Sequence, residues 1–146
     1  MELEFASKVP KEYREAVEEL FFFNPQQSRV REGIINSLEK FGLPRLEVKD
    51  DFLSVQIADV EAQTLFAFRK TKRKSDPVGV VVFLRTCREE IGILHIAVSS
   101  DYSLRGSKAN LGLGIQLMEK VREIAARIVG VERIYFFYRR EAVIKV

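Results

Sequence analysis

The sequence has few of the side chains that form disulfides or bind metal ions. It contains one cysteine, Cys87, and one histidine, His95, in 146 residues. A single cysteine cannot form a disulfide within the chain, and no Cys/His group has the spacing of metal ligands. We therefore expect a reducing compartment and no metal site.

Long apolar runs are also absent. No stretch approaches the roughly 20 residues that a membrane-spanning helix needs. The first residues, Met-Glu-Leu-Glu-Phe, are acidic and alternating, which is not the pattern of a secretory signal. The sequence thus predicts a cytoplasmic protein with no membrane partner.

Length and composition favour one domain. A chain of 146 residues can bury a substantial core, and it contains no repeat, low-complexity tract or Gly/Ser-rich linker, so we expect a single domain over 1–146. The 24 basic and 21 acidic residues give a net charge of +3 and a pI near 9.1. This mixed surface is mildly biased toward anionic partners, and a phosphate-bearing ligand would suit it.

The first third of the chain predicts a strand followed by two helices. Residues Glu2 to Ala6 suit a short strand, and Pro10 fits the first turn of a helix that ends at Asn24-Pro25. Its apolar stripe consists of Tyr13, Val17, Leu20 and Phe21. The second helix begins at Ser28 as a plausible N-cap and ends at Gly42 and Pro44, with Val30, Ile34, Leu38 and Phe41 at helical spacing.

The remainder predicts a sheet interrupted by one long helix. Residues 52–57, 64–69, 78–84 and 91–98 are rich in β-branched and aromatic residues and read as antiparallel strands. A helix over 110–129, ended by Gly130, precedes a strand over 131–138 and a short one over 142–146. The strand, helix and strand from 91 to 138 form a crossover, which makes its two strands parallel. The expected fold is α/β, with a mixed, mostly antiparallel sheet.

The loop before the long helix has the composition of an anion site. The stretch Arg105-Gly-Ser-Lys-Ala-Asn-Leu-Gly-Leu-Gly114 joins glycines and cations to a helix N-terminus, whose unpaired N–H groups attract negative charge. It is not a P-loop, because no Gly-Lys-Ser/Thr opens the helix. It is not the dinucleotide fingerprint either, because Leu117 takes the place of the last glycine.

The same region resembles the acetyl-CoA site of the GNAT family of N-acetyltransferases. Four elements stand in the family's order, from the strand into the helix: Ile96-Ala97-Val98, Asp101-Tyr102, Arg105-Gly106 and Gly112-x-Gly114. The resemblance covers about Thr64 to Tyr138 and implies the GNAT fold and acetyl-CoA as cofactor. It also implies direct attack of an amine, from a small molecule or a peptide, on the thioester.

The resemblance implies cofactor-binding residues, carried over position by position. Main-chain groups of Ile96 and Val98 would pair with the pantetheine, and the Val98 N–H is a candidate oxyanion donor. The phosphates would be held by Asn110, Leu111, Gly112, Leu113 and Gly114, beside the charges of Arg105 and Lys108. The chain departs from the family in having Ala109 where a Gln or Arg is usual and a longer loop before Gly112. Leu94 stands where a carboxylate is often found, and the helix that usually supplies a tyrosine acid has no room before Val146.

Two residues are candidates for proton transfer. His95 could deprotonate the amine directly or through water, and Tyr138 could protonate the leaving thiolate. The alternative is that His95 is a packed or exposed strand residue and that Tyr138 is a core or rim aromatic. Cys87 has no base near it in sequence and is expected to be an inert thiol.

Two further functions compete with the transferase. A GNAT-like domain could hold acyl-CoA as a sensor without turnover, which the missing carboxylate and final helix favour. The basic run Arg69–Lys74 could bind nucleic acid or the 3′-phosphate of CoA, but a solvated hairpin turn is the favoured interpretation, so no nucleic-acid partner is expected. An uncovered sheet edge at the C-terminus motivates the expectation of a homodimer.

Overall fold

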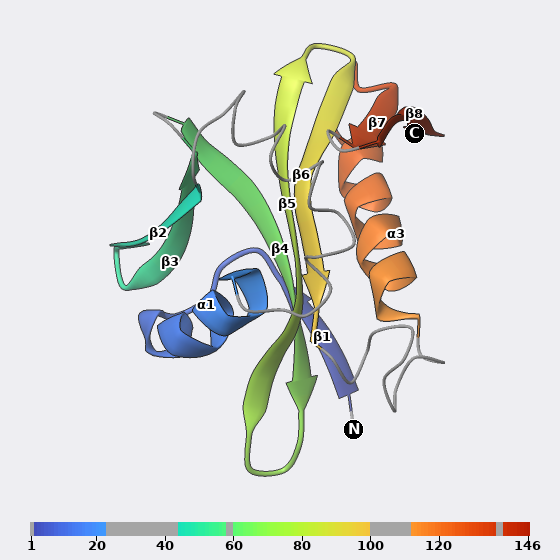
Figure 1. Ribbon diagram of the computed structural model, residues 1–146. Helices are drawn as coiled ribbons and strands as arrows, with labels where there is room; N and C mark the ends of the chain where they lie inside the picture. Colours follow the sequence, from blue (N-terminus) through green and yellow to red (C-terminus); the bar gives the residue numbers. More distant parts are fainter. Residues whose placement is uncertain (1, 23–43, 58–59, 100–111, 137–138) are drawn as a thin grey trace.

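The computed structural model describes residues 2–22, 44–57, 60–99, 112–136 and 139–146. Within these ranges one sheet contains eight strands (Figure 1). They are β1 (Glu2–Ala6), β2 (Pro44–Lys49), β3 (Phe52–Ile57), β4 (Val60–Lys70), β5 (Ser75–Cys87), β6 (Glu90–Val98), β7 (Arg133–Phe136) and β8 (Arg139–Lys145). The helical elements are a 3-10 turn η1 (Lys11–Tyr13), α1 (Arg14–Phe22) and α3 (Leu113–Ala126).

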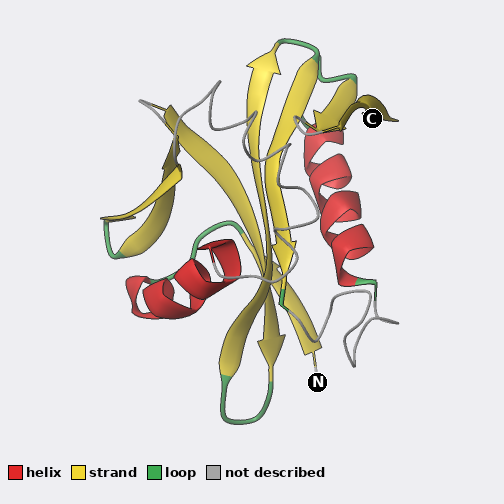
Figure 2. Cartoon of the chain, in the orientation of Figure 1, coloured by secondary structure: helices red, strands yellow, loops and turns green. Residues whose placement is uncertain are grey.

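The sheet is mixed and mostly antiparallel. Its strand order is β2-β3-β4-β5-β6-β7-β8, and β1 pairs with β4 beside this path. Strands β6 and β7 pair in parallel, and α3 lies between them in the chain. The two helices lie on either side of the long central strands (Figure 2). The remaining pairs are antiparallel. The parallel pairing expected from the sequence is therefore present.

The sheet divides the core into two clusters. On one face, Val17 and Leu20 of α1 pack with Phe66, Phe68 and strand residues of β3, β5 and β6. On the other face, α3 buries one side chain every four residues, namely Leu113, Leu117, Val121 and Ala125. This spacing places a single stripe of the helix on the sheet, as its apolar periodicity predicts.

Gly79 sets how closely α3 approaches the sheet. A β-carbon at this position of β5 would lie 3.0 Å from Leu117 Cδ1 and 3.2 Å from Leu113 Cδ2. The glycine thus leaves the space that the first two turns of α3 occupy, and it fixes the N-terminus of that helix near the end of β6, where Gly79 pairs with Val98.

The strands over 2–6 and 52–57 have the predicted bounds, and the other described elements differ from the prediction by one or more residues. The strand over 2–6 is confirmed, but β2 was not predicted, and β4 and β5 extend beyond 64–69 and 78–84. Helix α3 begins at Leu113 instead of residue 110. The C-terminal strand begins at residue 139 instead of 142. The predicted helix from Ser28 to Phe41 lies outside the described residues.

No helix in the described ranges is both long enough and apolar enough to span a bilayer.

Candidate functional site

A β-bulge interrupts β6 in its middle. Opposite β5, Ile93 pairs with Phe83 and His95 pairs with Val82, so Leu94 is an extra residue on β6. Among the described residues, the parallel ladder between β6 and β7 includes Glu90 to Ile93 of β6. A bulge bends its strand and increases the local twist. The change in direction therefore falls directly after the β6 residues of this ladder.

Main-chain groups beyond the bulge have a defined direction. The Ser99 N–H donates to the Val78 carbonyl at 2.8 Å, toward β5. Alternate residues of a strand direct their main-chain groups to opposite sides. Those of Val98 and Ile96 consequently point away from β5, toward the β7 side of β6. This is the direction that the predicted contacts of Ile96 and Val98 require.

His95 lies on the face of the sheet that α1 covers. Directly paired residues on antiparallel strands point to the same face, and its partner Val82 belongs to the cluster on the α1 side. The side chains of Ile96 and Val98 pack on the opposite face, with α3.

The imidazole of His95 is a weak base in this setting. Its Nε2 atom is buried. Burial disfavours the charged imidazolium and lowers the pKa of His95 from 6.5 to about 4. The ring is therefore neutral at pH 7, and it can accept a hydrogen bond or a proton there with little driving force.

The N-terminus of α3 is uncapped by the side chains that the structure describes. Gly112 is its N-cap with φ of 58°, and the first turn contains no acidic residue. A β-carbon on Gly114 would meet no described atom within 4 Å. The first turn thus offers main-chain N–H groups and positive helix-dipole charge, which favour an anion.

This geometry corrects one part of the expected phosphate site. Gly112 precedes the helix instead of lying within it, because its left-handed conformation does not continue a right-handed helix. The Leu113 side chain is fully buried against the sheet, so only its main chain is available to a ligand. Five candidate residues, Arg105, Lys108, Asn110, Leu111 and Tyr138, lie outside the described residues.

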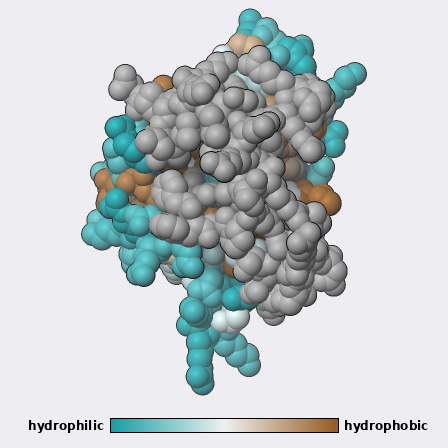
Figure 3. Space-filling model, viewed as in Figure 1, coloured by the Kyte–Doolittle hydropathy of each residue, from teal (hydrophilic) through white to brown (hydrophobic). Residues whose placement is uncertain are grey.

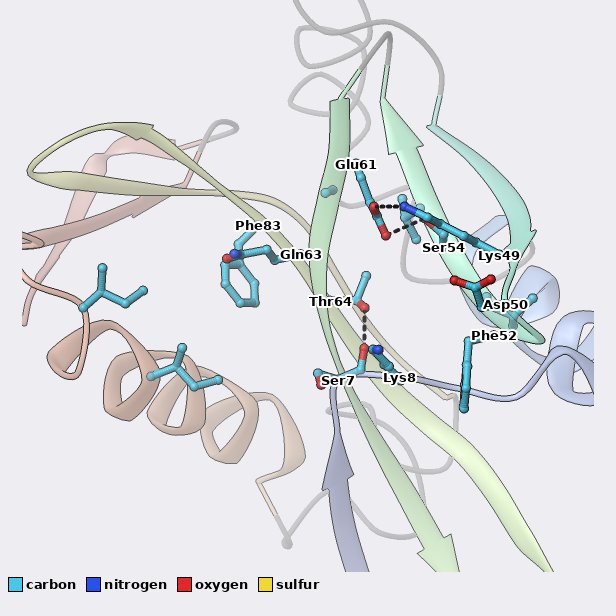
Figure 4. A pocket seen from close by; sticks show the side chains of 15 residues that line it. Ser7, Lys8, Lys49, Asp50, Phe52, Ser54, Glu61, Gln63, Thr64 and Phe83 are labelled. Carbon is cyan, nitrogen blue, oxygen red and sulfur yellow. Dashed lines mark hydrogen bonds and ion pairs between the residues drawn. The ribbon is translucent and has the colours of Figure 1, made fainter.

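A groove of about 810 Å³, which the sequence did not predict, lies along the edge of β4 and near the C-terminal end of α3 (Figure 4). It opens where β3 and β1 diverge along β4, and Ile124 of α3 and Ile128, just after the helix, form an apolar wall. Thr64 Oγ1 donates to the Ser7 carbonyl at 3.1 Å in this gap. The opening is a consequence of two strands sharing one edge of β4, which local patterns do not encode.

A hydrogen-bonded network of polar side chains lies at the groove. Glu61 accepts hydrogen bonds from Ser54 Oγ at 2.9 Å and Lys49 Nζ at 3.3 Å, and both lower the pKa of its carboxyl group. Gln56 Nε2 in turn donates to Ser54 Oγ at 2.9 Å. The network links β2, β3 and β4, so we interpret it as stabilising the pairing of these three strands at the edge of the sheet.

Neither metal nor thiol chemistry has support among the described residues. No group of three or more His, Cys, Asp or Glu residues is arranged there to hold a metal ion. Cys87 is exposed, with its Sγ 3.5 Å from Glu89 Oε2. A neighbouring carboxylate does not stabilise a thiolate.

Comparison with known proteins gave one distant likeness of note. No family model and no curated protein matches the chain. Among solved structures, it is similar to a protein from Desulfovibrio desulfuricans classed as an acetyltransferase of the GNAT family. The identity is 18%, the match covers 92% of this chain and 72% of that chain, and the TM-score is 0.49. A likeness this distant assigns no role to any residue.

Proposed function

We propose that this protein is an acetyl-CoA-dependent N-acetyltransferase of the GNAT type. One observation carries the proposal: the residues of the GNAT-like motif that the structure describes converge at one place. Ile96 and Val98 stand at the carboxyl end of β6, beyond the bulge, and Gly112 and Gly114 stand at the start of α3. Gly79 joins the two, because it pairs with Val98 and contacts the first turns of α3.

The described residues fit the phosphates of such a cofactor. An anion at the start of α3 would meet main-chain donors, no competing acid in the first turn and no side chain at Gly114. The resemblance makes the Val98 N–H the candidate oxyanion donor, and the main-chain groups of Val98 are directed away from β5. When bound, acetyl-CoA supplies an activated acyl group as a thioester.

His95 is retained as the candidate base. It is neutral at pH 7 and can accept the proton of an attacking amine, directly or through water. Its low pKa also favours the second candidate function, an acyl-CoA sensor without turnover, as does Leu94 in place of a carboxylate. Turnover of an amine separates the two functions.

The first test is calorimetric titration with acetyl-CoA and CoA. Gly114→Glu places a carboxylate at the start of α3, where a β-carbon meets no described atom within 4 Å, and Gly114→Gln is its uncharged match. We expect micromolar binding by the wild type, a loss of roughly tenfold or more in Gly114→Glu, and little loss in Gly114→Gln. Gly112 is a poorer choice for substitution, because its φ of 58° would strain any side chain.

Absence of binding by the wild type would refute both the transferase and the sensor. Equal losses in the two variants would show that the first turn of α3 holds no anion. Binding without turnover across a panel of primary amines would select the sensor.

A further inference from the structure

The β4–β5 hairpin concentrates the positive charge of the protein. Within six residues it contains Arg69, Lys70, Lys72, Arg73 and Lys74. Two carboxylates lie against this run, those of Glu4 and Asp76. The excess of positive over negative charge in this group equals the net charge of +3 of the whole chain, so basic and acidic residues are equal in number in the rest of the chain.

Ion pairs leave the tip as the exposed part of this charge. Asp76 pairs with Arg69 Nη2 at 3.6 Å and with Lys74 Nζ at 3.5 Å, and Lys70 Nζ pairs with Glu4 at 2.9 Å. The side chains of Lys72 and Arg73 are exposed, and neither forms an ion pair with another described residue. Thr71 closes the turn by donating its N–H to the Lys74 carbonyl at 2.8 Å. The expected solvated turn is therefore confirmed, with two cations available at its tip.

The hairpin lies at the end of the sheet that carries the proposed cofactor site. It projects beyond the carboxyl end of β6 and the start of α3 (Figure 1). In the space-filling view it forms a hydrophilic projection from the body (Figure 3). Strand β5 connects the two places directly, since it runs from the turn to Gly79, which touches α3.

The tip lies away from the place where β5 touches α3. Lys74 precedes Gly79 by five residues, roughly 16 Å at about 3.3 Å per residue. A ligand that spans both places must therefore be larger than a small amine.

We propose that the amine acceptor is a polypeptide with an acidic segment, and that Lys72 and Arg73 at the hairpin tip bind this segment. The inference rests on the proposed function. Polypeptides carry nucleophilic amines, whereas the exocyclic amines of nucleobases are weakened by conjugation with the ring. The hairpin also lacks an aromatic residue from Arg69 to Asp76 on which a base could stack.

The test measures fluorescence anisotropy of a labelled oligoglutamate peptide on the full chain. The variant is Lys72→Gln with Arg73→Gln, and the matched control is Arg127→Gln with Lys145→Gln. The control pair consists of exposed cations that lie away from the hairpin tip. Arg127 directly follows the C-terminus of α3, and Lys145 is in the edge strand β8. We expect affinity to fall roughly three- to tenfold in the tip variant and less than twofold in the control. Added salt should weaken wild-type binding and diminish the difference between the proteins.

Other outcomes overturn the inference in distinguishable ways. Failure of the peptide to bind while acetyl-CoA binds refutes the acidic-segment proposal and leaves the proposed function standing. Failure of acetyl-CoA to bind refutes the function and the acceptor assignment together. Equal losses in the tip variant and the control would show non-specific attraction. Tighter binding of a DNA duplex through Lys72 and Arg73, or loss of acetyl-CoA affinity in the tip variant, would assign the tip to phosphate instead.

Discussion

The pKa of His95 offers the most direct check on the structure of β6. Burial of the imidazole lowers this pKa from 6.5 to about 4. Because His95 is the only histidine, its ring resonances need no assignment by mutagenesis. We expect the ring in the folded protein to titrate near pH 4 by two-dimensional proton–carbon NMR.

The same shift predicts how stability depends on pH. The unfolded chain takes up a proton near pH 6.5 and the folded chain only near pH 4, so between these values the unfolded state binds more protons. The stabilising contribution is present above pH 6.5 and is lost as the pH falls toward 4. A shift of this size corresponds to about 3 kcal/mol in total, of which about 2 kcal/mol disappears between pH 7 and pH 5.

Urea unfolding at pH 7 and pH 5 tests this difference in the wild type and in His95→Gln. Both proteins lose stability through their carboxylates, but only the wild type should lose the additional 2 kcal/mol or so that belongs to the histidine. A ring that titrates near pH 6.5 would refute the burial argument, because it would place the imidazole in water. Equal pH dependence of the two proteins would refute the linkage.

Three further substitutions test individual contacts by urea unfolding. Gly79→Val should destabilise the protein by about 1 to 3 kcal/mol, because its side chain would push α3 from the sheet; Gly79→Ala should cost less. Arg85→Gln should cost about 1 kcal/mol, since Arg85 Nη2 donates to the carbonyls of Arg88 at 2.7 Å and Val129 at 2.8 Å. Asp51→Gly should stabilise by about 0.5 kcal/mol, because the φ of 68° favours glycine and only an exposed ion pair is lost. A change of opposite sign in any of these would contradict its argument.

The sequence predicted the strands whose side chains alternate clearly or whose apolar runs are long. The edge strand β2 was missed because, among its described side chains, only Leu46 is buried, while Arg45, Glu47 and Lys49 are exposed and charged. A strand with one buried residue has little hydrophobic pattern, and Pro44 suggested only the end of a helix. Its pairing with β3 supplies the hydrogen bonds that the pattern does not reveal.

The start of α3 shows a different limit of sequence patterns. The helical periodicity extends back to Leu111, so the sequence predicts a helix from residue 110. The positive φ of Gly112 excludes a continuous helix through this residue, since a left-handed residue cannot lie inside a right-handed helix. A glycine in the sequence permits this conformation, but its presence does not predict it. The effect on the site is large, because the first N–H groups of α3 move three residues along the chain.

The bulge at Leu94 decides which face of the sheet His95 occupies. Strict alternation from Ile91 and Ile93 would place His95 beneath α3, in the same cluster as those two residues. The extra residue shifts it to the face of Val82 and α1, while Ile96 returns to the α3 face. If His95 accepts the proton in the proposed transfer, the amine must reach it from the α1 side of β6. The cofactor phosphates would meanwhile lie at the start of α3, so the acceptor and the cofactor would meet across the edge of one strand.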